Sequence, residues 1–318
     1  MFYKDKKIAV AGGSGMVGSH LIKALLERGA LVRTNTFSRN LNFHHDNLEV
    51  IDNLDLESAD NCNSFLKDQE IVFNVAGQIA HPAKVSTDFQ IALNQVTITT
   101  NLCEASLIND LSGYCDLNSS TGYPDIRKPI PEEEFWKDEP YISYYGYGWS
   151  RRYREKIMEH LSHLSDIKIS ICRGTAMFGP GDNFNPETSH VIPALISRIL
   201  SGENPLKVWG SPDVVRDFLY VKDVVKGMLL VVEKGESMEP YNLGYGSTVT
   251  IGELVKNIVE ASGLDIDYTF DETKPTTIPF RMVDTAKIKN NIGFDPSYTL
   301  LEGLKETITW YKENRLDN

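Results

Sequence analysis

The stretch KKIAVAGGSGMVGSHLIKALLERGA, residues 6–30, holds two hydrophobic patterns separated by glycines. Residues 8–11 form a short apolar run, which is typical of a buried strand in a parallel sheet. Apolar residues then recur with the helical period until Arg28 and Gly29 end the pattern. These apolar residues are Val17, Leu21, Ile22, Leu25 and Leu26. The stretch therefore predicts a strand, a glycine turn and a helix.

Three glycines, Gly12, Gly15 and Gly18, stand in the turn with the spacing GxxGxxG. In a strand-turn-helix unit the first glycine permits the sharp turn, the middle one lets a pyrophosphate approach the backbone, and the last allows close helix packing. A plain tight turn also explains a glycine triplet, but the flanking strand and helix favour a dinucleotide cofactor. We therefore expect these glycines to bind the cofactor. Four further residues are expected to line it: Met16, Val17, Ala76 and Asn94.

Four more apolar runs of strand length follow: LEVID (48–52), EIVFNVAG (70–77), GYCDLNSS (113–120) and DIKISICR (166–173). Helix-like segments separate them, notably residues 88–107. Strands that alternate with helices over about 175 residues predict βαβ units. The expected fold class is α/β, with a Rossmann-type doubly wound parallel sheet.

The texture of the sequence changes after residue 175, where turns and short elements prevail. Helical patterns recur near residues 190–201, 221–234, 250–262 and 299–313, and we place these helices in a smaller lobe. We expect a dinucleotide-binding domain over residues 1–175. A smaller α/β substrate-binding lobe is expected over residues 176–318, with some chain crossing between the two.

The composition is that of a globular protein, because 41% of the 318 residues are apolar and 24% are charged. The formal net charge of −12, without a basic stripe, argues against nucleic-acid binding, since phosphates require clustered Lys and Arg. Neither a signal-peptide pattern nor eighteen consecutive apolar residues occur, so we expect no membrane span and a cytoplasmic location. The cysteines lack CxxC spacing and predict reduced thiols without a metal site: Cys62, Cys103, Cys115 and Cys172.

The end of the second strand, in LVRTNTFSRN (31–40), bears on the choice of cofactor. Proteins that use NAD place a carboxylate there for the adenosine ribose, whereas the extra phosphate of NADP requires hydroxyl or guanidinium donors. Thr36, Phe37, Ser38 and Arg39 occupy this position, without an acid. The sequence therefore favours NADP over NAD, with Ser38 and Arg39 as donors. Arg39 is equally compatible with a solvated loop charge.

Two later segments carry groups suited to chemistry. In LNSSTGYP (117–124), Ser119 follows an apolar strand, at the sheet edge where ligands of such folds bind, although its hydroxyl is also compatible with a simple turn. In YYGYGWSRRYREK (144–156), Tyr147 and Arg151 stand one helical turn apart. Hydride transfer to a ketone requires a proton for the alkoxide, and a tyrosine supplies it when a nearby cation stabilises the phenolate. Ser119 would then hold the carbonyl oxygen.

On these residues the chain resembles the extended short-chain dehydrogenase/reductase family, also called the NAD-dependent epimerase/dehydratase family. Its members carry the glycine triplet, a Ser or Thr four residues before a Tyr, and Tyr-x-x-x-Lys. Here Ser119 precedes Tyr123 by four residues, and Arg151 stands where the family has lysine. The resemblance implies that Ser119, Tyr147 and Arg151 are catalytic and that Tyr147 and Arg151 also contact the cofactor. Arginine keeps the charge of lysine, but its longer planar fork occupies a different place.

Three longer segments are similar to the GDP-L-fucose synthase subgroup of that family: residues 179–198, 208–224 and 270–284. The similarity implies a GDP-linked sugar as substrate, with His190 as an acid/base and Arg216 as a ligand of the diphosphate. Without the family, His190 is compatible with a capping or a packing histidine and Arg216 with a surface ion pair. Further substrate contacts are expected at Ser120, Thr121, Asn183 and Trp209.

Departures from the subgroup narrow the expected reaction. Thr121 replaces the cysteine that serves epimerisation, and a hydroxyl is too weak an acid or base to exchange a proton beside a ketone. Ser14 replaces a basic residue in the glycine turn, which weakens the preference for NADP, and Ala176 replaces an asparagine. A 3,5-epimerisation is therefore not expected.

The leading hypothesis is an NAD(P)-dependent oxidoreductase that acts at C4 of a GDP-linked sugar, by 4-keto reduction or 4-hydroxyl oxidation. The alternative is a nucleotide-sugar 4-epimerase with tightly bound NAD. A cofactor-binding protein that has lost catalysis is a third reading, suggested by the absence of the lysine. By analogy with its relatives, we expect a homodimer formed through helices near residues 93–107 and 147–163.

Overall fold

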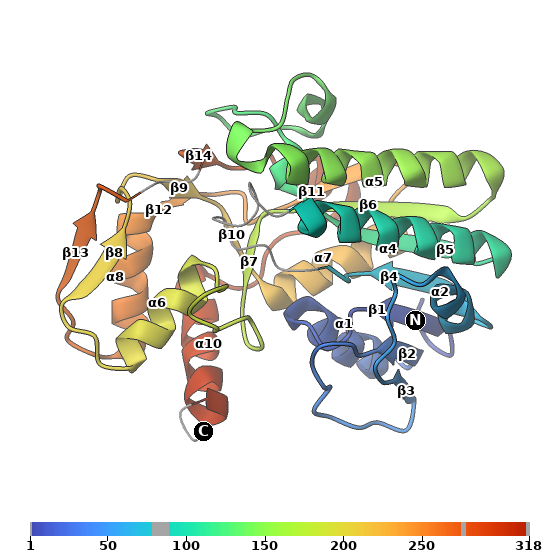
Figure 1. The fold of residues 1–318 in the computed structure, drawn as a ribbon, viewed down its shortest axis with the longest axis horizontal. Helices are drawn as coiled ribbons and strands as arrows, with labels where there is room; N and C mark the ends of the chain where they lie inside the picture. Colours follow the sequence, from blue (N-terminus) through green and yellow to red (C-terminus); the bar gives the residue numbers. More distant parts are fainter. Residues whose placement is uncertain (1, 78–88, 275–277, 316–318) are drawn as a thin grey trace.

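The central feature of the computed structural model is a parallel sheet (Figure 1). The structure describes residues 2–77, 89–274 and 278–315. Within these residues the sheet has seven strands in the order β11-β6-β5-β4-β1-β2-β3. The strands are β1 (Lys7–Ala11), β2 (Leu31–Asn35), β3 (Leu48–Ile51), β4 (Ile71–Asn74), β5 (Gly113–Ser119), β6 (Lys168–Gly174) and β11 (Pro240–Leu243). From β1 the strand order runs to one edge of the sheet through β2 and β3, and from β4 it runs to the other edge through β5 and β6. The predicted doubly wound sheet is therefore confirmed, with its switch point between β1 and β4.

Helices cover both faces of the sheet. One face carries α2 (Ala59–Leu66), α4 (Phe89–Ile108) and α5 (Tyr145–Leu164), and the other carries α1 (Met16–Glu27) and α7 (Val221–Lys234). Strand β1 between them is apolar on both sides, as a doubly covered sheet favours. In β1, Ile8 and Val10 belong to the core beneath α1 and α7, whereas Ala9 and Ala11 belong to the core beneath α2, α4 and α5.

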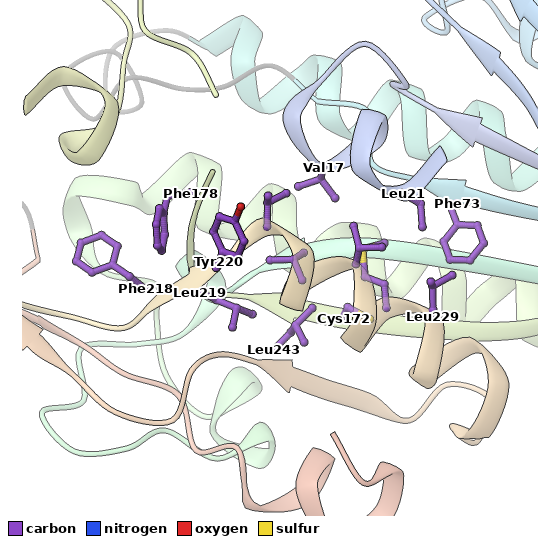
Figure 2. Packing of buried hydrophobic residues seen from close by; sticks show 14 of the residues in the cluster. Val17, Leu21, Phe73, Cys172, Phe178, Phe218, Leu219, Tyr220, Leu229 and Leu243 are labelled. Carbon is purple, nitrogen blue, oxygen red and sulfur yellow. The ribbon is translucent and has the colours of Figure 1, made fainter. Parts of the chain in front are cut away.

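The apolar face of α1 is buried as its helical period predicts, from Val17 to Leu26. Figure 2 shows Val17 and Leu21 in one core with Phe73 of β4 and Leu229 of α7. Helix α7 therefore packs against α1 and the large sheet. Our assignment of residues 221–234 to the smaller lobe is wrong, because the apolar face of α7 covers the sheet before the chain forms β11 at its edge.

The smaller lobe combines helices with short strands, at the left of Figure 1. Its helices include α6 (Val191–Leu200), α8 (Ile251–Ser262) and α10 (Leu300–Arg315), and α8 packs against the other two. Helix α9 (Ala286–Ile292) instead contacts β11 and α7. The short strands pair as β7 (Ala176–Phe178) with β10 (Phe218–Tyr220), β9 (Val215–Arg216) with β12 (Val249–Thr250) and β14 (Phe280–Arg281), and β8 (Leu206–Trp209) with β13 (Tyr268–Asp271).

A long connection joins β5 to α5 and contains three short 3-10 helices: η1 (Ser120–Gly122), η2 (Glu132–Trp136) and η3 (Ile142–Tyr144). The Arg152 guanidinium anchors this connection by donating to the carbonyl oxygens of Gly122 and Asp138. The described helices include none that is both long and apolar enough to cross a membrane. In the same part of the chain, no three His, Cys, Asp or Glu side chains are grouped to hold a metal ion.

Candidate active site

The glycines of the turn differ in what excludes a side chain: atoms of the described chain do so at Gly12 and Gly18, but not at Gly15. Gly12 has a φ of +89°, and a Cβ there would lie 2.7 Å from the Cα of Ala76. A Cβ on Gly18 would lie 2.2 Å from the Gly12 carbonyl oxygen. Helix α1 can therefore pack this closely on the turn only because residue 18 has no side chain. At Gly15 that same oxygen, at 3.4 Å, is the one atom near. Among the described residues no contact explains glycine at position 15, whereas an approaching pyrophosphate does.

The first turn of α1 completes this cradle. The helix begins at Met16, its N-cap residue Gly15 provides no side-chain cap, and its first turn has no acidic residue. The amide groups of such a turn lack helical acceptors and stand at the positive end of the helix dipole. The predicted residues Gly12, Gly15, Met16, Val17 and Gly18 therefore form a turn that fits the pyrophosphate of NAD or NADP.

A carboxylate lies beside the end of β2, although β2 itself provides none. The buried Thr36 Oγ1 donates a hydrogen bond to the Oδ1 of Asp52, 2.7 Å away, because β3 runs parallel to β2 and ends at the residue before Asp52. Ser38 and Arg39 are exposed. Sequence reasoning missed Asp52, because the carboxylate that binds the ribose of NAD is expected at the end of β2 itself. The signal was available in the aspartate that ends LEVID.

Tyr147 and Arg151 are in direct contact near the start of α5. The Arg151 Nη2 donates a hydrogen bond to the Tyr147 Oη, and the Arg151 Cζ lies 4.4 Å from the centroid of the Tyr147 ring. Burial lowers the pKa of Arg151, and the neighbouring Tyr147 opposes that shift. Because arginine remains charged in proteins, it places a full positive charge at the tyrosine hydroxyl.

The start of α4 packs against the same tyrosine. Ile91 is buried against Tyr147 and Tyr144. Asn94 follows Ile91 by one helical turn, and its Oδ1 accepts a hydrogen bond of 2.7 Å from the Gln90 Nε2. The expected cofactor contact of Asn94 stays a prediction.

Ser119 is the last residue of β5, and its loop touches α5. The Ser119 Oγ accepts hydrogen bonds from the Thr121 backbone N, at 3.2 Å, and from the Thr121 Oγ1, at 3.0 Å. A Cβ on Gly148 would lie 2.9 Å from the Thr121 carbonyl oxygen, so α5 packs on this loop one residue beyond Tyr147. The structure thus brings the loop that carries Ser119, the buried Ser120 and Thr121 against the start of the helix that carries Tyr147. Ser119 also has the turn-forming role that the sequence left open.

His190 and Asn183 bound the loop before α6. His190 is exposed at the N-cap position, and its side chain forms no cap hydrogen bond, so the capping role left open by the sequence is not observed. Asn183 is buried, and its Nδ2 donates to the Thr188 Oγ1 at 2.8 Å while its Oδ1 accepts from the Asn185 N at 3.2 Å. The amide of Asn183 therefore shapes the loop that presents His190, and its substrate contact stays a prediction.

Two arginines face one another in the smaller lobe. The parallel pairing of β9 and β14 sets Arg216 beside Arg281. The Arg281 guanidinium donates to the carbonyl oxygens of Pro124 and Tyr123, at 3.0 and 3.2 Å. Burial, followed by the charge of Arg216, lowers the pKa of Arg281 to about 10. Burial also lowers the pKa of Arg216. A buried cation beside a half-buried one favours an anion between them.

Arg281 is a functional candidate that sequence reasoning missed. It lies within the segment 270–284 that carried the family resemblance, of which residues 275–277 lie outside the described residues. Only the pairing of β14 with β9 brings it to Arg216, and these strands are two residues long. Trp209 is 69% exposed on β8, and the Lys274 Nζ lies over its ring, 5.5 Å from the centroid.

Comparison with known proteins places this geometry in a family. The model of the NAD dependent epimerase/dehydratase family matches residues 8–244, which include the glycine turn, Ser119, the Tyr147–Arg151 pair and Arg216. The chain belongs to this family. The family resemblance inferred from the sequence is thereby confirmed.

Curated proteins and solved structures match almost the whole chain. A probable GDP-L-fucose synthase 1 from Oryza sativa subsp. japonica is 32% identical, and the match covers 98% of this chain and 94% of that protein. The structure is similar to UDP-glucose 4-epimerase from Thermotoga maritima with UDP-glucose, at a TM-score of 0.87 and 25% identity, covering 96% of this chain and 99% of that one. It is also similar to MoeE5 in complex with UDP-glucuronic acid and NAD, at a TM-score of 0.83 and 26% identity, with the same coverage.

Proposed function

We propose that the chain is an NAD(P)-dependent oxidoreductase that acts at C4 of a GDP-linked sugar. The observation that carries the proposal is the contact of the Arg151 guanidinium with the Tyr147 hydroxyl, next to the loop of Ser119. A tyrosine held by a cation is suited to exchange a proton with a sugar oxygen as a hydride is transferred. The lost lysine therefore has a charged replacement in place, which argues against a decayed site.

Each chain residue has a distinct part in this reaction. A dinucleotide held at the glycine turn would supply or accept the hydride. Tyr147 gives a proton to the C4 oxygen from its Oη during reduction, or takes that proton during oxidation. Arg151 stabilises the phenolate that results, and the Ser119 Oγ orients the C4 oxygen. The same groups serve both directions, so the direction depends on the substrate offered.

The arginine pair supports a nucleotide sugar as substrate. A sugar nucleotide carries a diphosphate between its base and its sugar, and Arg216 with Arg281 offers two cations to it. The exposed ring of Trp209 offers a stacking surface for the base. GDP is proposed as the nucleotide because the relative from rice is named a GDP-L-fucose synthase.

A 4-epimerase with tightly bound NAD is the second candidate. The likeness to the UDP-glucose 4-epimerase of Thermotoga maritima favours it. The chemistry requires no further acid, because Tyr147 exchanges the proton in both half-reactions. Between them the keto sugar would rotate, so that the hydride returns to its opposite face. Net consumption of cofactor distinguishes the oxidoreductase from the epimerase.

We further propose that the enzyme does not catalyse 3,5-epimerisation. The Thr121 hydroxyl donates to the Ser119 Oγ at 3.0 Å, and a hydroxyl in this position is too weak an acid or base to exchange a carbon-bound proton. Incubation with GDP-4-keto-6-deoxymannose in deuterated water should leave C3 and C5 no more exchanged than in an enzyme-free control. Enzyme-dependent deuterium at both carbons would contradict this proposal.

NAD is proposed as the cofactor, in place of the NADP that the sequence favoured. The Asp52 carboxylate beside Thr36 supports NAD, because it would accept ribose hydroxyls and repel an additional phosphate. Asp52→Asn should narrow the preference for NAD over NADP in calorimetric titrations, whereas Ser38→Ala should change it little. Equal preference in wild type and Asp52→Asn would refute the role of Asp52.

The function is tested by mass spectrometry of what copurifies, followed by assays with GDP- and UDP-linked sugars and each oxidised or reduced cofactor. We expect turnover of a GDP-linked sugar with a stoichiometric change in cofactor absorbance. A C4 epimer formed without net change of cofactor would establish the alternative. Absence of turnover with every nucleotide sugar, from a protein that binds the dinucleotide, would refute both.

A further inference from the structure

The face of β5 that meets α5 is polar, although the space between a sheet and its covering helix is usually apolar. Tyr114, Asp116 and Asn118 alternate along β5 and so share one face, and each is at most 1% exposed. We call these three residues the β5 polar row. Burial of polar groups costs free energy unless partners satisfy them, so the partners of the row indicate its purpose.

The row joins the two elements that carry the proposed catalytic residues. The Asn118 Nδ2 donates to the Arg151 carbonyl oxygen, at 3.0 Å, and to the Glu155 Oε1, at 2.9 Å. The Asp116 Oδ1 accepts from the Arg154 Nη2 at 2.5 Å. Because β5 ends at Ser119 and α5 begins near Tyr147, these bonds fix one element against the other just behind the active site.

Arg154 brings a second cation close to Arg151. Both guanidinium groups are buried, with 1% and 7% of each residue exposed. Burial lowers the pKa of Arg151 and the charge of Arg154 lowers it further, whereas Tyr147 and Asp116 raise it. The other charged group of this region, Glu155, is paired with Arg173 at 2.8 Å. Asp116 is therefore the carboxylate that offsets the two cations behind Tyr147.

Several buried polar atoms of Asp116, Arg151 and Arg154 form no hydrogen bond with the residues that the structure describes, so electrostatic attraction is what stabilises them. Within the described residues, the Asp116 Oδ2, the Arg151 Nε and the Arg154 Nε are buried without a hydrogen-bond partner. Asp116 is also reached by the Asn74 Nδ2 at 3.0 Å, and Arg154 by the Gln95 Oε1 at 3.0 Å. In the part of the chain that the structure describes, the further titratable neighbours are Tyr114 on β5 and Cys103 on α4, whose pKa values burial raises, so both stay neutral near pH 7.

Stability alone does not account for a buried pair of this kind. Replacement of a buried ion pair by apolar residues is often neutral or stabilising, because both ions lose their hydration. We propose that Asp116 and Arg154 are positioning residues with opposite effects on the Arg151 guanidinium: the charge of Arg154 keeps it toward the Tyr147 hydroxyl, and the charge of Asp116 limits that effect. The proposal rests on the proposed function, in which Tyr147 exchanges the proton.

The two single substitutions should act in opposite directions. Arg154→Met leaves the Asp116 carboxylate unbalanced, so that it draws Arg151 away from Tyr147 and opposes the phenolate. Asp116→Asn leaves an excess positive charge that favours the phenolate. The double variant removes both charges and restores the balance. Arg154→Lys keeps the charge and serves as the conservative replacement.

The readout is the pH midpoint of tyrosinate absorbance, taken as the difference between each protein and its Tyr147→Phe counterpart. We expect a midpoint higher by about one pH unit in Arg154→Met and lower by about one in Asp116→Asn. The double variant and Arg154→Lys should return to the wild-type midpoint. The pH profile of kcat should follow the same order. Lys156→Met removes an exposed cation from α5, where it pairs with Glu159, and should leave the midpoint unchanged.

A purely structural pair predicts another pattern, in which the single variants lose thermal stability and rate at an unchanged midpoint. That pattern, or shifts of both single variants in the same direction, would overturn the proposal. If one single variant does not fold, Arg154→Lys and the surviving variant decide by the same criterion. The absorbance titration requires no substrate. A wild type that converts no nucleotide sugar would therefore refute the proposed function without touching this test.

Discussion

At the scale of single residues, Gly15 and Gly18 look equivalent in sequence but differ in what they meet. A side chain at Gly18 collides with the turn, whereas one at Gly15 enters space that the protein leaves open. Gly15→Val should therefore keep the melting temperature and lose dinucleotide binding in calorimetry. Gly18→Val, the matched variant, should lower the melting temperature itself. Unchanged affinity in Gly15→Val would mean that the turn binds no pyrophosphate.

The Tyr147–Arg151 pair makes a second prediction at this scale. Tyr147→Phe should remove nearly all C4 redox activity and spare cofactor binding, because only the proton-exchanging group is lost. Arg151→Lys should retain substantial activity. Arg151→Met should lose most of it and move the pH optimum upward, since the phenolate loses its cation. A wild-type rate and pH profile in Arg151→Met would show that the contact is only packing.

Single residues also mark the limit of prediction from sequence. Ser119, Tyr147 and Arg151 were identified because their spacing lies within one loop or one helical turn. Asp52, Arg281 and Asp116 were not, because each acquires its role from a neighbour in another strand or helix. Strand register and the packing of helices on the sheet, neither of which a single sequence states, create those pairs.

At the scale of elements, the loop from β7 to α6 packs on the start of α1. A Cβ on Gly181 would lie 3.9 Å from the Met16 Cα, and the next residue, Asp182, is buried. Burial raises the pKa of Asp182 to about 7, opposed by the Asn183 backbone amide and by Arg39. Its folded-state pKa thus exceeds the unfolded one, so its contribution to stability is full below pH of about 4 and falls as pH rises to about 7.

The prediction for this loop follows from the raised pKa of Asp182. Asp182→Asn keeps the acceptor for the Asn183 amide and removes the charge, so it should stabilise the protein increasingly from about pH 4 to pH 7 and level off above. The gain at pH 8 is about 4 kcal/mol at most. Thermal unfolding of both proteins across this range measures it. A difference that does not vary with pH would contradict a buried carboxylate.

The existence of helices and strands was predicted better than the sheet or lobe that each of them joins. The apolar runs predicted β1 and β3 to β6, since a buried strand leaves a local signature, and β2 was placed within residues 31–40. The same signature does not say which sheet or lobe an element joins. Helix α7 and strand β11 returned to the large sheet from the half of the sequence assigned to the smaller lobe.

At the scale of the whole molecule, α4 and α5 lie side by side on the outside of the large sheet (Figure 1). Their surface includes apolar side chains, among them Leu93 at 43%, Trp149 at 38% and Tyr153 at 56% exposed. Exposed apolar groups gathered on neighbouring helices are typical of protein interfaces. They support the homodimer expected from the resemblance, with four helices at its centre.

The dimer is tested by light scattering at micromolar concentration. We expect twice the chain mass of 35.8 kDa. Tyr153→Asp should shift the protein toward monomer, because it places a charge in the apolar contact, whereas Tyr268→Asp, an exposed tyrosine of the smaller lobe, should not. Tyr153 lies outside the catalytic pair but on its helix, so loss of the partner should also loosen α5 and lower kcat. A wild-type protein that stays monomeric would refute the dimer, and full activity in a monomeric Tyr153→Asp variant would show that the site is complete within one chain.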